Sequence, residues 1–252
     1  MSEETCENFF LVASEEDLRL KLFWNEKIAK AEGWQNFKAI DIDLYQIWRE
    51  WESESFRRAG DPLWRALGFK GRPGEIKAHD RPPIIFDATA GFGIDSLRLL
   101  FYGGEVYSFE RSQLLLKLLA SGRGELLAKL PPEVSQKLSW RLIAGDACNN
   151  PTALPRPEII YLDPMYPPRV REKGAQSKEM RVLQRMVGKG SEEEDQRLFA
   201  WAKALSPKRI IVKRPFYANP FAKNPLASIK GKLLRFEVYS YSSLEPEKFS
   251  LK

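Results

Sequence analysis

The segment Asp163-Pro164-Met165-Tyr166-Pro167-Pro168 directly follows the apolar run EIIYL, which has the composition of a buried strand. An exocyclic amine on a nucleobase is a poor nucleophile because its lone pair is delocalised into the ring. Acceptors for the amine protons localise that lone pair, so the Asp163 carboxylate and the Pro164 carbonyl predict chemistry on such an amine. Tyr166 is then expected to stack on the extruded base. A rigid turn after a core strand is the alternative interpretation.

A second group of residues, DATAGFGID from Asp87 to Asp95, follows an earlier apolar run. Gly91 and Gly93 let the backbone approach a ligand closely, and the N–H groups near Ile94 favour a ligand carboxylate or phosphate. The turn lacks the third glycine of the dinucleotide fingerprint, so by itself it also fits a purely structural helix start.

Two further expected strand ends carry groups that suit a nucleoside. Glu110, followed by Arg111, lies about twenty residues beyond the glycine turn, where an acid can accept both ribose hydroxyls of a cofactor. The Asp146 carboxylate is placed to accept from an adenine amino group, with the Ala147 backbone at the ring edge. A surface acid paired with Arg111 and a helix-capping Asp146 are the alternatives.

These residues come together only if a parallel sheet aligns the strand ends. Strands are expected at 83–88, 105–110, 139–146, 158–163 and 208–214, with helices between them. One helix is expected from Ser112 to near Pro131, and another from a cap at Ser191 to about Leu205. The terminal segment LLRFEVYSYSS alternates like an antiparallel edge strand. The expected fold class is α/β, with a Rossmann-like doubly wound sheet.

The first part of the chain has a different pattern. Residues 8–43 contain short alternating apolar stretches, and residues 44–69 predict two amphipathic helices divided at Gly60-Asp61-Pro62. A stretch rich in Gly, Pro and charge, 68–83, is expected to be a linker or lid. The predicted organisation is a small α+β N-terminal extension, 1–79, and a main domain, 80–252.

Composition excludes several classes of protein. The 252 residues are 43% hydrophobic and 29% charged, which is typical of a globular protein. With two cysteines and one histidine, a disulfide framework, a metal centre or a histidine-based relay is disfavoured, and no metal is expected. No apolar run approaches the ~18 residues of a membrane span, and the N-terminus is acidic, so a cytoplasmic protein is expected.

The distribution of charge favours a polyanionic partner. The net charge is +6, although the first 17 residues hold six acids and no Lys or Arg. Basic residues gather around and beyond the Asp163 segment, and they are expected to contact RNA phosphate, so that binding weakens with salt. Ordinary solvated charge is the alternative. The expected contacts are Arg169, Arg171, Lys173, Lys178, Arg181, Lys213 and Arg214, with Lys223, Lys230, Lys232 and Arg235 further along.

Taken together, DATAGFGID, FER, DPMYPP with its trailing SKEMRVLQRMVG, and KRIIVKRPFYA resemble a known family. The family that they resemble is that of the bacterial small-subunit (16S) ribosomal RNA guanine-N2 methyltransferases of the J type. These enzymes belong to the class I methyltransferases that use S-adenosylmethionine (SAM). The likeness runs from about Gly60 to Tyr239. It implies a class I methyltransferase fold and methylation of a guanosine N2 amine in small-subunit RNA or the subunit. It also implies that SAM contacts Ile94, Asp95, Glu110, Arg111, Asp146, Ala147 and Asp163.

Other functions remain open at the level of sequence. The same loop suits adenine-N6 in RNA or DNA, or a protein glutamine, because it accounts for an amine rather than a particular amine. A nicotinamide oxidoreductase fits the glycine turn and Glu110, and a non-catalytic RNA-binding assembly factor fits the charge.

Overall fold

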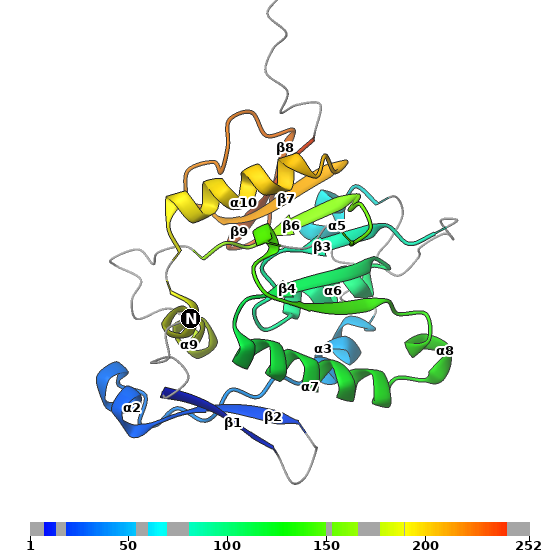
Figure 1. Cartoon of the computed structure of the whole chain (residues 1–252). Helices are drawn as coiled ribbons and strands as arrows, with labels where there is room; N and C mark the ends of the chain where they lie inside the picture. The colour runs from blue at the N-terminus through cyan, green and yellow to red at the C-terminus, as the bar shows by residue number, and fades with distance from the viewer. Residues whose placement is uncertain are drawn as a thin grey trace, which may run out of the picture.

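A computed structural model describes residues 8–13, 19–53, 60–69, 81–149, 153–165, 177–188 and 190–240. Its centre is a seven-stranded sheet in the order β5-β4-β3-β6-β7-β9-β8 (Figure 1). Strands β5, β4, β3, β6 and β7 are parallel, whereas β9 and β8 are antiparallel. The bounds are β3 Ile84–Asp87, β4 Glu105–Glu110, β5 Trp140–Ala144, β6 Ile159–Leu162, β7 Arg209–Pro215, β8 Ala227–Lys230 and β9 Leu234–Tyr239.

Helices cover both faces of this sheet. Helix α10 lies over one face, and α5, α6 and α3 lie on the other (Figure 1). The bounds are α2 Glu26–Glu32, α3 Leu44–Trp51, α5 Pro62–Leu67, α6 Ile94–Phe101, α7 Gln113–Lys129, α8 Pro132–Ser135, α9 Lys178–Val187 and α10 Glu192–Ala204, with a 3-10 turn, η1, at Ala147–Asn149. In the described part of the chain, no helix is both long and apolar enough to cross a membrane.

Successive side chains of a strand point to opposite faces of the sheet, so neighbouring apolar residues enter the hydrophobic cores on the two faces. Ile85 packs with α3, α5 and α6, while its neighbour Phe86 packs towards α10. Ile159 and Ile160 on β6 divide in the same way. Burial on both faces explains why these strands are apolar throughout instead of alternating with polar residues.

The order in which the strands are added to the sheet reverses between β3 and β6. From β3 it proceeds outward to β4 and β5, and β6 then pairs with the other side of β3. The carboxyl ends of β3 and β6 therefore border a topological switch point, which is where open α/β sheets bind ligands. Asp87 ends β3, and Asp163 directly follows β6.

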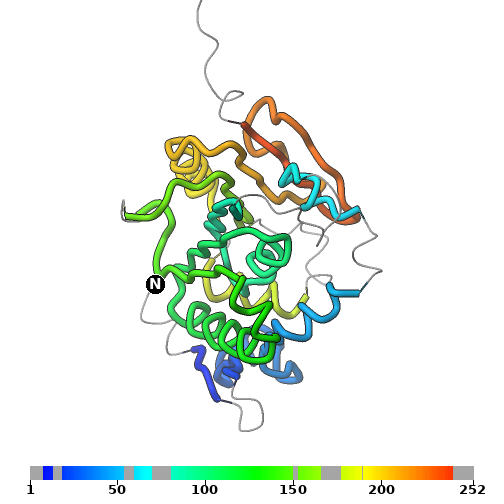
Figure 2. Tube along the Cα trace, turned by 90° about the vertical axis from the view of Figure 1, so that its right-hand side faces the viewer, coloured from blue at the N-terminus to red at the C-terminus, as the bar shows by residue number. Residues whose placement is uncertain are grey.

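The first part of the chain packs against the sheet domain. A hairpin of β1 (Phe9–Ala13) and β2 (Leu20–Trp24) lies beside α7 at one end of the molecule, opposite β8 and β9 (Figure 2). Trp48 of α3 and Trp64 of α5 are buried in the same core as Ile85. The division at residue 79 remains a prediction about chain organisation, but one hydrophobic core runs across it.

Most expected elements are present. The strand at 105–110 has the expected bounds, and the other four expected core strands differ by one or two residues at their ends. Ser191 caps α10 as expected, by accepting from Glu194 N, and Ser112 caps α7 by accepting from Leu115 N. The expected linker lies mostly outside the described residues.

The prediction that the last strand is an edge strand was wrong. Strand β9 lies between β7 and β8, and nearly all of its residues are buried. The true edge is β8, a four-residue strand, ASIK, whose weak apolar pattern gave no signal. Covering β9 with β8 satisfies the second set of β9 backbone groups.

Candidate active site

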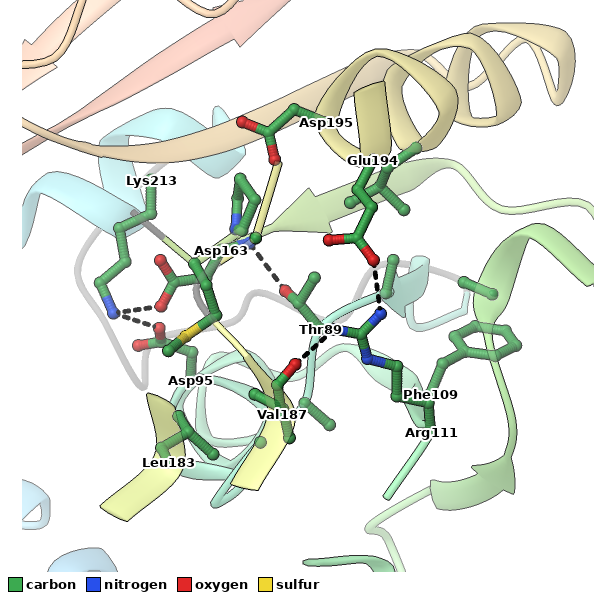
Figure 3. A pocket seen from close by; sticks show the side chains of 18 of the residues that line it. Thr89, Asp95, Phe109, Arg111, Asp163, Leu183, Val187, Glu194, Asp195 and Lys213 are labelled. Carbon is green, nitrogen blue, oxygen red and sulfur yellow. Dashed lines mark hydrogen bonds and ion pairs between the residues drawn. The ribbon is translucent and has the colours of Figure 1, made fainter. Parts of the chain in front are cut away.

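A cavity of about 480 Å³ opens at the carboxyl ends of β3, β4, β5 and β6 (Figure 3). Each of these strand ends supplies lining residues, and Leu183 and Val187 of α9 close the opposite side. The volume falls within the range of about 300–1,000 Å³ that is typical of sites for cofactors. The four strand ends selected from the sequence therefore meet in one place.

The glycine turn joins β3 to α6 with backbone angles that favour glycine. Gly91 has φ +53° and Gly93 has φ +78°, both in the left-handed region. A Cβ on Gly93 would also lie against Leu119 Cδ1, so any other residue here would require the Leu119 side chain to move. Among the residues that the structure describes, no side chain caps the N-terminus of α6. Its N–H groups are therefore placed to bind acceptor atoms of a ligand.

Glu110 fixes this turn against β4. Its carboxylate accepts from Gly91 N at 2.9 Å and from Ser112 N at 2.7 Å. Burial raises the pKa of Glu110, and these backbone hydrogen bonds partly oppose that rise. The side chain also lines the cavity, so each oxygen retains acceptor capacity there. Contact with ribose hydroxyls stays a prediction.

Asp146 and Arg111 form parts of the cavity wall. Asp146 accepts from Cys148 N at 2.9 Å and forms an ion pair with Arg197. Burial acts to raise the pKa of Asp146, but the two partners hold it below the usual value. Arg111 donates to Glu194 Oε1 at 3.0 Å and to the Val187 carbonyl at 2.9 Å (Figure 3). Arg111 thus links the end of β4 to α9 and α10.

A lysine lies between two carboxylates on the β6 side of the cavity. Lys213 Nζ is 2.6 Å from Asp95 Oδ2 and 2.9 Å from Asp163 Oδ2 (Figure 3). The Tyr161 hydroxyl donates to the same oxygen of Asp95 at 2.7 Å. The Asp163 backbone N–H donates to Thr89 Oγ1 at 2.7 Å, which ties the end of β6 to the end of β3.

These contacts set opposite pKa directions for the two acids. Burial acts to raise the pKa of Asp95, but Lys213 and Tyr161 hold it below the usual value. Burial raises the pKa of Asp163, and Lys213 only partly offsets the rise. Against the effect of burial, the two carboxylates raise the pKa of Lys213, which keeps its ammonium charged. The sequence pattern did not predict this arrangement.

Four of the expected RNA contacts have protein partners instead of a free surface. Lys178 donates to the Lys38 carbonyl at 3.3 Å, and Arg181 donates to the Glu32 carbonyl at 2.8 Å. Lys213 bridges the two acids, and Arg214 is 8% exposed and donates to the Asn219 carbonyl. These contacts account for the four residues without RNA, so a phosphate role remains only a prediction for them. Tyr166, Arg169, Arg171 and Lys173 lie outside the described residues.

The donor and acceptor set of the cavity fits SAM. Six acids line it, Asp95, Glu110, Asp146, Asp163, Glu194 and Asp195, alongside a helix N-terminus that no side chain caps in the described part of the chain. Lys213 and Arg111 are each paired with acids already, which leaves acceptor capacity in excess. A ligand with hydroxyls, amino groups, a carboxylate and a positive sulfonium matches both features. No cluster of three or more metal-ligating side chains occurs among the described residues.

Comparisons with known proteins agree with this geometry. A family model described as "Putative SAM-dependent methyltransferase" matches residues 4–241. "Ribosomal RNA small subunit methyltransferase J" of Yersinia pestis is 39% identical over 168 residues, which are 65% of this chain and 64% of that protein. The protein of the same name from Thioalkalivibrio sulfidiphilus is 39% identical over 185 residues, 71% of this chain and 67% of its own length. The matches thus span about two thirds of these relatives.

The fold also has a counterpart among solved structures. A SAM-dependent methyltransferase from Neisseria gonorrhoeae superimposes with a TM-score of 0.60 at 22% identity. The match covers 98% of this chain and 88% of that one, and it supports the Rossmann-like class I arrangement. Because the family model matches residues 4–241, the chain belongs to the SAM-dependent methyltransferase family.

Proposed function

We propose that this protein transfers a methyl group from SAM to the exocyclic N2 amine of a guanosine in small-subunit (16S) ribosomal RNA. Its relatives are named as methyltransferases of that RNA, and the resemblance of the DPMYPP segment to their J type motivates guanine-N2. The observation that carries the proposal is the position of Asp163, directly after β6 on the wall of the cavity. The substrate is small-subunit RNA or the subunit, in the cytoplasm.

The geometry supports a specific role for Asp163. Its Oδ2 is held by Lys213, and Oδ1 has no hydrogen-bond partner among the described residues. Oδ1 is therefore the atom that accepts from the guanine amine, with the Pro164 carbonyl as the second acceptor. Holding both amine protons localises the nitrogen lone pair and aims it at the methyl group.

The remaining residues hold and orient the cofactor. SAM, when bound, supplies a methyl group already activated by the sulfonium charge. Glu110 would accept from the ribose hydroxyls, Asp146 and Ala147 would contact the adenine, and the N–H groups of α6 would receive the carboxylate. Asp95 stays ionised on the cavity wall because Lys213 and Tyr161 stabilise its charge, and it would offer that negative charge to the positive sulfonium of SAM. The amine proton leaves to Asp163 or to water once the new N–C bond forms.

The test is incubation of the protein with labelled SAM and small-subunit RNA or particles from cells that lack the enzyme. Nucleosides are then identified by mass spectrometry. N2-methylguanosine supports the proposal, and mapping its position defines the target. Methyladenosine would replace guanine by adenine as the substrate, and cofactor binding without any transfer would reject the RNA assignment.

A further inference from the structure

The turn between β8 and β9 carries the most exposed large apolar side chain of the described residues. Leu233 is 84% exposed, compared with 58% for Leu226. Leu233 is also among the residues that line the cavity, so it stands at the cavity mouth. A single exposed leucine is ordinary on a protein surface, but one at the mouth of a substrate site is placed to contact the substrate.

Strand pairing explains why this turn reaches the cavity. Leu234, the first residue of β9, pairs with Pro215 at the carboxyl end of β7. Strand β7 runs parallel to β3 and β6, so its carboxyl end lies at the same end of the sheet as theirs. Leu226, by contrast, donates its N–H to the Val238 carbonyl, near the other end of β9. The two exposed leucines therefore lie at opposite ends of the β8–β9 strand pair.

Hydrogen bonds hold the turn and the start of β9 in place. Gly231 N donates to the Leu234 carbonyl at 2.8 Å, which closes the turn. Arg235 donates to the carbonyls of Pro215, Phe216 and Ala218 and pairs with Glu237. Arg235 is 9% exposed, so it is held by these groups and does not serve phosphate from the surface.

Two exposed cations precede Leu233 closely in the sequence. Lys230 and Lys232 are exposed and make no ion pair within the described ranges. This contrasts with Lys178, Arg181 and Lys213, whose charged groups have protein partners. The turn thus combines an apolar tip with free positive charge, which suits a nucleic-acid backbone with a gap between its bases.

We propose that Leu233 is the wedge that occupies the space in the RNA stack vacated by the target guanosine, while Lys230 and Lys232 hold the flanking phosphates. A base must leave its stack to reach Asp163, and unstacking is costly unless the gap is filled. The inference rests on the proposed function and adds to it how the base is extruded.

The experiment compares Leu233→Ala with Leu233→Phe and with the matched control Leu226→Ala at the other end of β8. The substrate is the small-subunit RNA segment that carries the mapped guanosine, in folded form and as an unstructured oligonucleotide. Leu233→Ala should slow methylation of the folded RNA by about tenfold or more. The unstructured oligonucleotide should be affected less than about threefold, and Leu233→Phe should restore activity. Leu226→Ala should match the wild type.

A second readout reports extrusion directly. With 2-aminopurine in place of the target guanosine, the wild-type protein should raise its fluorescence, and Leu233→Ala should not, at concentrations where both bind the RNA. Equal fluorescence changes, or equal slowing on both RNA forms, would overturn the wedge. If the wild type methylates no RNA, the proposed function fails; if it does and Leu233→Ala is fully active, only the wedge fails.

Discussion

Replacing Lys213 by methionine removes the only positive charge seen between Asp95 and Asp163 in the described part of the chain. Lys213 Nζ lies 2.6 Å and 2.9 Å from one oxygen of each acid. Without it, two carboxylates share a partly buried site, and like charges at that separation disfavour ionisation. Loss of an opposite charge within hydrogen-bond distance raises a carboxyl pKa by about 1–3 units.

Ionised Asp163 accepts from the substrate amine more strongly than the neutral acid does, so the acid limb of the pH–rate profile should move upward by about 1–3 units in Lys213→Met. Each unit below the apparent pKa lowers the ionised fraction tenfold. At a pH below the apparent pKa of the wild type, turnover should therefore fall by about ten- to thousandfold, and it should recover as the pH rises above the new apparent pKa. Lys213→Arg keeps the charge and should retain most activity.

The assay is the rate of methyl transfer to RNA at saturating SAM between pH 5 and 9.5. The matched control is Lys208→Met, because Lys208 is 75% exposed and pairs with Glu158 away from the cavity. An unchanged acid limb in Lys213→Met, with normal folding, would refute the electrostatic role of Lys213.

Three further variants test other parts of the site. Glu110→Gln should weaken SAM binding about tenfold, measured by calorimetry, because the amide presents an N–H where the carboxylate accepts from Gly91 N and Ser112 N. Gly93→Ala should lower the free energy of unfolding by about 1–3 kcal/mol in urea titrations, since its Cβ meets Leu119 and its φ is +78°. Burial raises the pKa of Asp87 to about 7, above its unfolded value, so ionising it should cost the folded state stability as pH rises from 4 to 7. That cost is on the order of 4 kcal/mol, and Asp87→Asn should flatten the pH dependence of unfolding over this range.

The parallel sheet was predictable because its strands are buried on both faces. Ile84–Asp87 and Ile159–Leu162 are apolar runs bounded by polar turns, and that pattern is typical of strands covered on both sides by helices. Since parallel strands align their carboxyl ends, the cavity followed from Asp87, Glu110 and Asp163 at those ends. The short β8 strand carries no such pattern and was missed.

The role of charged residues was less predictable, because their partners are distant in the chain. Lys213 is 118 residues from Asp95 and 50 from Asp163, and it was interpreted as a phosphate contact. Arg181 binds the Glu32 carbonyl 149 residues away, and it lies over the Trp34 ring. Sequence reveals that a region is basic, but only the fold reveals which of its cations are already paired.

The same contacts give the first part of the chain a role that sequence left open. Arg181 and Lys178 of α9 bind backbone carbonyls of residues 32–39, while Leu183 of the same helix lines the cavity. Val182 and Met186 pack in one cluster with Trp34. The extension therefore positions one wall of the cavity.

The most direct test of this role of Asp163 compares the wild type with Asp163→Ala in one experiment. Both proteins are incubated with labelled SAM and unmethylated small-subunit RNA, nucleosides are identified by mass spectrometry, and SAM affinity is measured in parallel. We predict N2-methylguanosine with the wild type, and at least a hundredfold lower rate with Asp163→Ala at a SAM affinity within about tenfold, because alanine removes the acceptor oxygen. A fully active Asp163→Ala protein, or a methylated product other than N2-methylguanosine, would contradict the proposal.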